Sequence, residues 1–304
     1  MTTASAIEFA APPVRRQSLW RSLRGELKGS EYTWALAFVV PYIGVFLAFV
    51  VYPAVYGLWL GSEPSLYTEL FSDPIYQSTV VNTVLFIAFG VNVKMFIALL
   101  LSGFFMRPGW WNKVLLMIFI LPWAVPALPS FISIHWMLNG EWGLLNNMLY
   151  AMFNIDGPSW LNERWTALGA VIVSHIWKWT PFWTVILLAG RMAIPTEIND
   201  AAKVDGATGV RNFIYVSFPL LANLYLICTL LSTIFTLGDF NEVYFISGGG
   251  PANSTHVLAT LGVRNAFDLA QPRLGVAAVM SALPLMIPLV IVLMRKLKTS
   301  EVQL

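Results

Sequence analysis

The chain has 304 residues, of which 57% are hydrophobic and only 11% are charged, and its mean hydropathy is +0.68. A soluble domain carries about 25% charged residues, so the composition excludes an ordinary soluble protein and indicates one polytopic membrane domain. The net charge of +2 points to no particular partner, and the single cysteine, Cys228, excludes an intrachain disulfide.

Residues 1–32 precede the first apolar run. They contain no apolar core of the kind that a cleaved signal peptide needs. We expect them to form a mostly disordered cytoplasmic tail. Its basic residues are Arg15, Arg16, Arg21, Arg24 and Lys28.

Long apolar segments, each of about 20 residues or more, predict six transmembrane helices and an all-α fold. They lie at residues 33–60, 79–105, 114–137, 165–189, 219–245 and 273–294. The fifth is the least regular, because Asp239 and Glu242 interrupt it. Together the spans define a membrane domain at 33–298, followed by a short tail at 299–304.

The distribution of basic residues predicts the orientation, because Lys and Arg gather on the cytoplasmic side of membrane proteins. With the N-terminus inside, thirteen of the Lys and Arg residues that flank the spans are cytoplasmic, and three, Arg164, Arg264 and Arg273, are outside. Both termini and the loop at 190–218 are therefore expected in the cytoplasm.

Several kinds of active site have no counterpart in the sequence. The chain lacks the Gly-x4-Gly-Lys-Ser/Thr phosphate loop, so it does not bind ATP by that device. Its three histidines are scattered, and we expect His135 and His175 to pack or to hydrogen-bond between helices rather than to bind metal. No pattern predicts a catalytic residue, a metal site or a contact with nucleic acid.

The loop at 190–218 predicts a short polar helix outside the hydrocarbon. Thr196 is expected to cap it, and Glu197 to oppose the positive end of the helix. Residues 200–202, Asp-Ala-Ala, continue the helix with small side chains that would let the surface of another protein approach closely.

The predicted helix ends in a turn. Asp205-Gly206 is a turn signal, and Gly206 is expected to adopt a backbone conformation that other residues resist. Residues 208–216 then predict a second helix that leads to the fifth span at Pro219. From these residues alone, an ordinary helix-turn-helix connector is an alternative to a docking site.

The spacing resembles the EAA loop of the permease subunits of binding-protein-dependent ABC importers. That loop reads Glu-Ala-Ala, three residues, Gly, nine residues, Ile, one residue and Leu-Pro; here Asp200, Val216 and Phe218 replace Glu, Ile and Leu. The resemblance implies a type I ABC importer permease fold, with a cytoplasmic coupling helix that fits into the ATPase subunit. The coupling residues that it implies are Glu197, Asp200, Ala201, Ala202, Asp205 and Gly206.

Further motifs resemble the maltose-type carbohydrate class. Residues 120–126 look like its Leu-Pro-x-x-x-Pro element, and Gly249-Gly250-Pro251 looks like its outer loop. The family implies a non-enzymatic, multi-pass subunit of the bacterial inner membrane with no cofactor of its own. Its implied partners are a second permease, two ATPase subunits that hold ATP and Mg²⁺, an external sugar-binding protein and membrane lipid.

Polar side chains recur along one face of the fifth span. Ser232, Thr236 and Asp239 have helical spacing, and polar residues within spans usually face a cavity or a partner. This face is expected to line a translocation path; hydroxyls that bond to their own helix are the alternative. The sugar contacts that the resemblance implies are Lys178, Trp179, Phe182, Ser232, Phe235 and Thr236.

Two lysines lie midway along spans, Lys94 in the second and Lys178 in the fourth. Each would cost about 2.5–3.5 kcal/mol if it faced lipid unpaired. We expect Lys94 to pair with an Asp or Glu of another helix or subunit. A sharper alternative is that one of the two lysines meets an anionic sugar.

Two other functions stay open at this point. A stand-alone secondary transporter would need ion-site carboxylates deep in several spans and internal repeats, and the sequence shows neither. An importer permease for a non-sugar solute or for an anionic sugar derivative would share most of the motifs. The Gly-Gly-Pro loop argues against a non-sugar solute.

Overall fold

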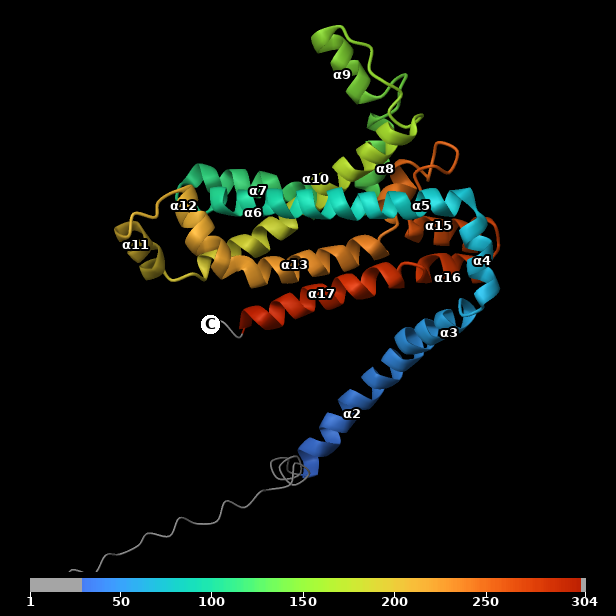
Figure 1. Ribbon diagram of the computed structural model, residues 1–304, viewed down its shortest axis with the longest axis horizontal. Coiled ribbons are helices and arrows are strands. Elements are labelled where there is room, and N and C mark those ends of the chain that lie inside the picture. The colour runs from blue at the N-terminus through green and yellow to red at the C-terminus, as the bar shows by residue number, and fades with distance from the viewer. Residues whose placement is uncertain (1–28, 302–304) are drawn as a thin grey trace, which may run out of the picture. The chain divides into compact units, whose positions relative to one another are not determined.

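The computed structural model describes residues 29–301, in which all the regular elements are helices (Figure 1). These residues divide into two compact units, one that ends at Gly57 and one that starts at Leu58. The first unit holds α2 (Gly29–Phe46), the π-helical turn Leu47–Val51 and most of α3 (Tyr52–Leu60). Its large apolar side chains are exposed, as expected of a helix that contacts lipid or another subunit.

The second unit contains the remaining helices. In chain order they are α4 (Pro64–Ser72), α5 (Pro74–Leu85), η2 (Phe86–Val91), α6 (Asn92–Phe105), α7 (Trp110–Ala124), α8 (Ala127–Met137), α9 (Leu144–Phe153), α10 (Arg164–Met192), α11 (Thr196–Val204), α12 (Val210–Asn212), η3 (Phe213–Ser217), α13 (Phe218–Gly238), α14 (Asn241–Ile246), α15 (Leu258–Val263), η4 (Arg264–Asp268), α16 (Pro272–Met280) and α17 (Leu283–Glu301).

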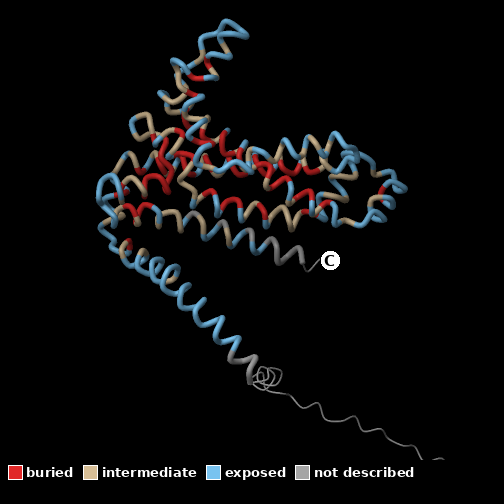
Figure 2. Tube along the Cα trace, turned by 180° about the vertical axis from the view of Figure 1, so that it is seen from behind, coloured by how far each residue is buried: buried red, intermediate tan, exposed pale blue. Residues whose placement is uncertain are grey.

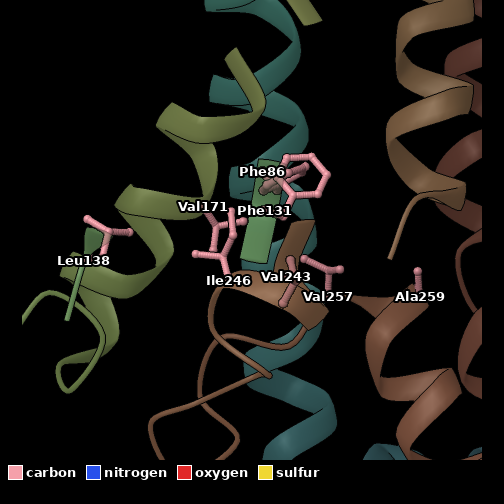
Figure 3. Close-up of a cluster of buried hydrophobic side chains, with 8 residues drawn as sticks. All are labelled: Phe86, Phe131, Leu138, Val171, Val243, Ile246, Val257 and Ala259. Carbon is pink, nitrogen blue, oxygen red and sulfur yellow. The ribbon is translucent and has the colours of Figure 1, made fainter. Parts of the chain in front are cut away.

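Helix α10 organises the second unit, because it packs against α6, α7 and α13, and α13 in turn packs against α17 (Figure 1). Buried residues concentrate where these helices meet (Figure 2). One apolar cluster joins η2, α8, α10, α14 and the start of α15 (Figure 3). Its members are Phe86, Phe131, Leu138, Val171, Val243, Ile246, Val257 and Ala259.

Within the described residues, four helices are long and apolar enough to cross a membrane, at Trp34–Leu60, Pro74–Phe105, Arg164–Met192 and Val210–Gly238. The predicted third span is broken: α7 and α8 meet at 90°, and the pair makes a fifth span when counted as one. Val125 has an extended backbone at the break. The cause is local, because a residue that precedes a proline, here Pro126, avoids the helical region.

The fifth span differs from its predicted bounds, 219–245, at both ends. Helical structure already begins at Val210 and continues through a π-helical turn, so the expected separate helix at 208–216 is instead the first part of the span. The helix ends at Gly238, because Asp239 is extended and its Oδ1 accepts a bond from the backbone N–H of Asn241. Glu242 therefore lies in a separate helix, α14.

The predicted sixth span, 273–294, is divided between α16 and α17. Helix α17 continues to Glu301, so the expected tail at 299–304 is helical for its first three residues. Most of the predicted N-terminal tail, residues 1–28, and residues 302–304 lie outside the described part of the chain.

Candidate functional site

A cavity of about 230 Å³ lies among α6, α7, α10 and α13. Aromatic rings form much of its wall, and Trp123 of α7 stacks on Phe182 of α10 with ring centroids 5.5 Å apart. The lining residues are Lys94, Trp123, His175, Trp179, Phe182, Trp183, Ser232, Phe235, Thr236 and Asp239. Aromatic faces with a few polar groups are the usual composition of a small-molecule site.

The structure brings six of the seven predicted path residues to this one cavity. Trp179 and Phe182 are three residues apart on α10, and Ser232 and Thr236 are four apart on α13, so each pair shares one helical face. The remaining two on the wall are Phe235 and Asp239. Lys178, the seventh, does not line it.

The buried ammonium of Lys178 instead forms hydrogen bonds to residues on both sides of the break between α7 and α8. It donates to the carbonyl of Pro122 at 2.7 Å, to the carbonyl of Val125, and to Oγ of Ser130 at 3.2 Å. Helix ends leave carbonyl groups without partners, and a cation is favourable at the negative end of a helix. Lys178 therefore stabilises the bend rather than facing the cavity.

A chain of polar side chains lies along one side of the cavity; we call Lys94, His175, Glu242 and Trp179 the polar core. Its members are buried except Trp179, which is half-buried. Nζ of Lys94 is 2.7 Å from Nε2 of His175, and Nδ1 of His175 is 2.8 Å from Oε1 of Glu242. An ammonium can only donate, so Nε2 accepts from Lys94 and Nδ1–H donates to Glu242. Nε1–H of Trp179 donates to the same carboxylate at 2.6 Å.

The polar core tests the predictions made for Lys94 and His175. Lys94 was expected to pair with an Asp or Glu of another helix or subunit, and its partner is instead the imidazole of His175. His175 was expected to pack or to hydrogen-bond between helices, and it bonds to Glu242 of α14. The only signal was the i, i+4 spacing of His175 and Trp179 on α10, which places both on one face.

The predicted coupling residues lie on or just after α11. Their side chains are exposed except that of Ala202, and Asp200 forms an exposed ion pair with Lys203 at 2.8 Å. The predicted cap is wrong, because Pro195 occupies the cap position and Thr196 is the first helical residue, with no side-chain cap bond. The exposed coupling residues are Glu197, Asp200, Ala201, Asp205 and Gly206.

Gly206 closes α11 in the conformation expected from the sequence. Its φ is +76°, and the backbone N–H of Ala207 donates to the carbonyl of Ala202 at 2.8 Å. A left-handed glycine followed by such a bond is a common helix end. A Cβ added to Gly206 would meet nothing within 4 Å, so the requirement for glycine comes from the backbone alone.

The loop that follows α14, residues 247–257, is held by the rest of the second unit; we call it the glycine loop. Asn82 of α5 donates to the carbonyls of Ser254 and His256 at 2.7 and 3.0 Å. Burial, aided by the Arg264 guanidinium, lowers the pKa of His256 to about 4. Within residues 29–301, no group of three His, Cys, Asp or Glu side chains could hold a metal ion.

Known proteins similar to this chain are transport permeases. The lactose transport system permease protein of Rhizobium radiobacter is 31% identical over 262 residues, which are 80% of this chain and 86% of that protein. The trehalose/maltose transport system permease protein of Thermococcus litoralis is 28% identical over 269 residues, covering 84% and 90%. The sulfoquinovosyl glycerol transport system permease protein of Agrobacterium fabrum is 33% identical over 193 residues, covering 64% and 62%.

A solved structure has the same fold. It is a chain of the bacterial alginate ABC transporter in complex with an alginate pentasaccharide-bound periplasmic protein, and it aligns with a TM-score of 0.79 at 20% identity. The alignment covers 90% of this chain and 95% of that chain. Residues 94–297 match the family of binding-protein-dependent transport system inner membrane components. The chain belongs to that family.

Proposed function

We propose that the chain is a permease subunit of a binding-protein-dependent ABC sugar importer, and that the cavity is its share of the sugar path. The names of the trehalose/maltose and lactose relatives support a sugar as the substrate. The single observation that carries the proposal is the cavity wall, because it combines aromatic rings with hydroxyl and carboxylate groups. Rings pack on the apolar faces of a sugar, and the polar groups bond to its hydroxyls.

A second permease subunit would complete this path. Phe235 is 61% exposed although it lines the cavity, so one wall is open in the isolated chain. In the proposed complex, six spans cross the inner membrane, with α16 and α17 together as the sixth, and both termini are cytoplasmic. The basic flanks of the spans support this orientation.

In the proposed importer, two ATPase subunits would bind α11. They would hold ATP and Mg²⁺ and supply the energy for transport. The exposure of α11 and its small side chains support this role, because a helix with an exposed face can bind in a groove of another protein. Closure of the ATPases would move α11, and with it α10 and α13, which flank it in the chain and carry most of the cavity wall.

Thiol labelling of the complete transporter tests the path. We expect Phe235→Cys to transport in proteoliposomes, and a bulky maleimide to block its ATP-dependent uptake of trehalose, maltose or lactose. The native thiol of Cys228 should not react with the maleimide, because Cys228 is buried. The matched control is Ile234→Cys, since Ile234 is an exposed neighbour on α13 that does not line the cavity.

The proposal fails if labelled Phe235→Cys still transports as well as labelled Ile234→Cys. Uptake by this chain alone, with no ATPase subunit present, would contradict the importer and favour a stand-alone secondary transporter.

A further inference from the structure

The charged groups beside the cavity carry no excess of positive charge. The polar core contributes the ammonium of Lys94 and the carboxylate of Glu242, and Asp239 adds a second carboxylate on the wall. The imidazole of His175 accepts from the ammonium of Lys94, so these groups together carry a net charge of −1. The wall therefore presents no net positive charge.

Lys178 does not change this balance at the wall. Its ammonium is buried and donates to two backbone carbonyls and to Ser130. The carbonyls at the end of a helix carry part of a negative charge, which offsets the ammonium where it sits. An anion in the cavity would therefore meet neither lysine as a free cation.

Asp239 keeps a carboxylate oxygen for a ligand. Both hydrogen bonds that it accepts from the described residues come from Asn241 and end on Oδ1, at 2.9 and 2.7 Å. Oδ2 can accept from a sugar hydroxyl. The same oxygen repels an anion, and the aromatic rings of the wall strengthen the repulsion because they lower the local dielectric constant.

Ser232 offers a second group that lacks a partner. Ser232 lines the cavity, and its Oγ is buried and forms no hydrogen bond within residues 29–301. A buried hydroxyl without a partner is costly, so the site gains when a ligand supplies one. A hydroxyl both donates and accepts, and an uncharged sugar hydroxyl matches it.

We propose that this cavity wall selects uncharged sugars and rejects anionic ones, through the carboxylate of Asp239 and through the compensation of Lys94 by Glu242. The inference rests on the proposed function, because it assigns the substrate class of the same path. Glu242 acts here as a positioning residue: it holds the indole of Trp179 at the wall and cancels the charge of Lys94.

The test uses the complete transporter with Phe235→Cys, in proteoliposomes without the binding protein, so that only the permease selects. The rate of thiol modification is measured against glucose, glucuronate and glucosamine, three sugars with the same ring and different charge. We expect half-protection by glucose at a concentration about tenfold lower than by glucuronate, because the anion meets the carboxylate of Asp239 beside aromatic rings of low dielectric constant. Glucosamine should protect at least as well as glucose.

Two substitutions should remove the selectivity. Added to Phe235→Cys, Asp239→Asn keeps the oxygen that bonds to Asn241 and should bring the glucuronate value close to that of glucose. Glu242→Gln leaves the charge of Lys94 uncompensated and should favour glucuronate further. The matched control is Glu69→Gln, an exposed carboxylate on α4, which should change neither value. If either variant fails to assemble, the ratio of the half-protecting concentrations of glucuronate and glucose in Phe235→Cys alone still tests the inference.

Protection by glucuronate at the same or a lower concentration than glucose would overturn the inference. So would the absence of protection by all three sugars in a transporter whose uptake the maleimide still blocks, and in that case the proposed function would stand. A maleimide that modifies Phe235→Cys without blocking uptake would overturn the proposed function instead.

Discussion

The segments at the two ends of α13 are held in opposite ways. Residues 239–257, which follow the helix, bury the carboxylate of Glu242 and the ring of His256, and Asn82 of α5 bonds to their backbone. Residues 193–209, which precede it, bury only Ala202, and their one ion pair, Asp200 with Lys203, is exposed on both sides.

The difference indicates where each segment finds its partners. A segment with buried, satisfied polar groups is fixed by its own chain and can hold side chains in register with a cavity. A segment with few buried contacts is stabilised locally and is free to follow a partner. Each of the following predictions tests one side of this contrast, from the largest expected effect to the smallest.

Removal of the buried carboxylate should cost the most. Glu242→Ala leaves His175 and Trp179 without their shared acceptor and removes the carboxylate that offsets the charge of Lys94. Breaking a buried pair from one side costs about 3–5 kcal/mol of unfolding free energy. The measurement is chemical unfolding of the detergent-solubilised transporter. Glu69→Ala, at an exposed carboxylate, is the control. Equal effects of the two substitutions would show that segment 239–257 is not held by the polar core.

Acid should weaken the glycine loop through His256. Its folded pKa is about 4, against about 6.5 in an unfolded chain, so the unfolded state binds the proton first. This contribution to stability is complete above pH 6.5, falls as the pH decreases and is lost below pH 4, on the order of 3 kcal/mol in all. His256→Gln should flatten the part of the pH dependence between pH 6.5 and 5. An unchanged slope would contradict the burial of a neutral ring.

Loss of the bridge from α5 should have an intermediate effect. Asn82→Ala removes the bonds to Ser254 and His256 and leaves two buried carbonyls without donors, which costs about 1–3 kcal/mol. The readout is the same unfolding curve. Asn92→Ala is the matched control, because Asn92 is exposed and bonds within its own helix. A loss no larger than that of the control would weaken the contrast.

Substitution at the end of α11 should affect stability least. Gly206→Ala places a Cβ at positive φ, at a cost of about 1–2 kcal/mol that is confined to the local turn, so global unfolding should hardly change. Stimulation of the ATPases by the binding protein should fall clearly. Gly169→Ala on α10 is the control, since its Cβ would also meet open space. Normal stimulation in Gly206→Ala would argue against α11 as the coupling element.

Local signals in the sequence predicted the helices and the faces that meet. Hydrophobic length located four helices long enough to cross a membrane but not the break in the third predicted span. Helical spacing placed Ser232 and Thr236 on one face. The left-handed conformation of Gly206 also followed from local sequence, because Asp-Gly is a turn signal and glycine adopts a positive φ at no steric cost. These features depend on residues that are close in the chain.

Contacts between segments distant in the chain could not be predicted from the sequence. His175 and Glu242 are 67 residues apart, and no periodicity relates them. The role of Lys178 was missed for the same reason. Its acceptors lie at a helix break that only two prolines, Pro122 and Pro126, indicate in the sequence. A lysine in an apolar span indicates a partner, but it does not say whether the partner is a ligand or a backbone carbonyl.

The hydrogen bonds of Lys178 at the bend between α7 and α8 have a consequence for biosynthesis. The chain emerges from the ribosome N-terminus first, so α7 and α8 reach the membrane before the lysine that closes their bend exists. Until residue 178 is inserted, the carbonyls of Pro122 and Val125 face hydrocarbon or retained water, and unpaired polar groups in lipid are costly. We therefore expect the bent pair of α7 and α8 to complete its insertion only with α10, so that the three helices assemble together.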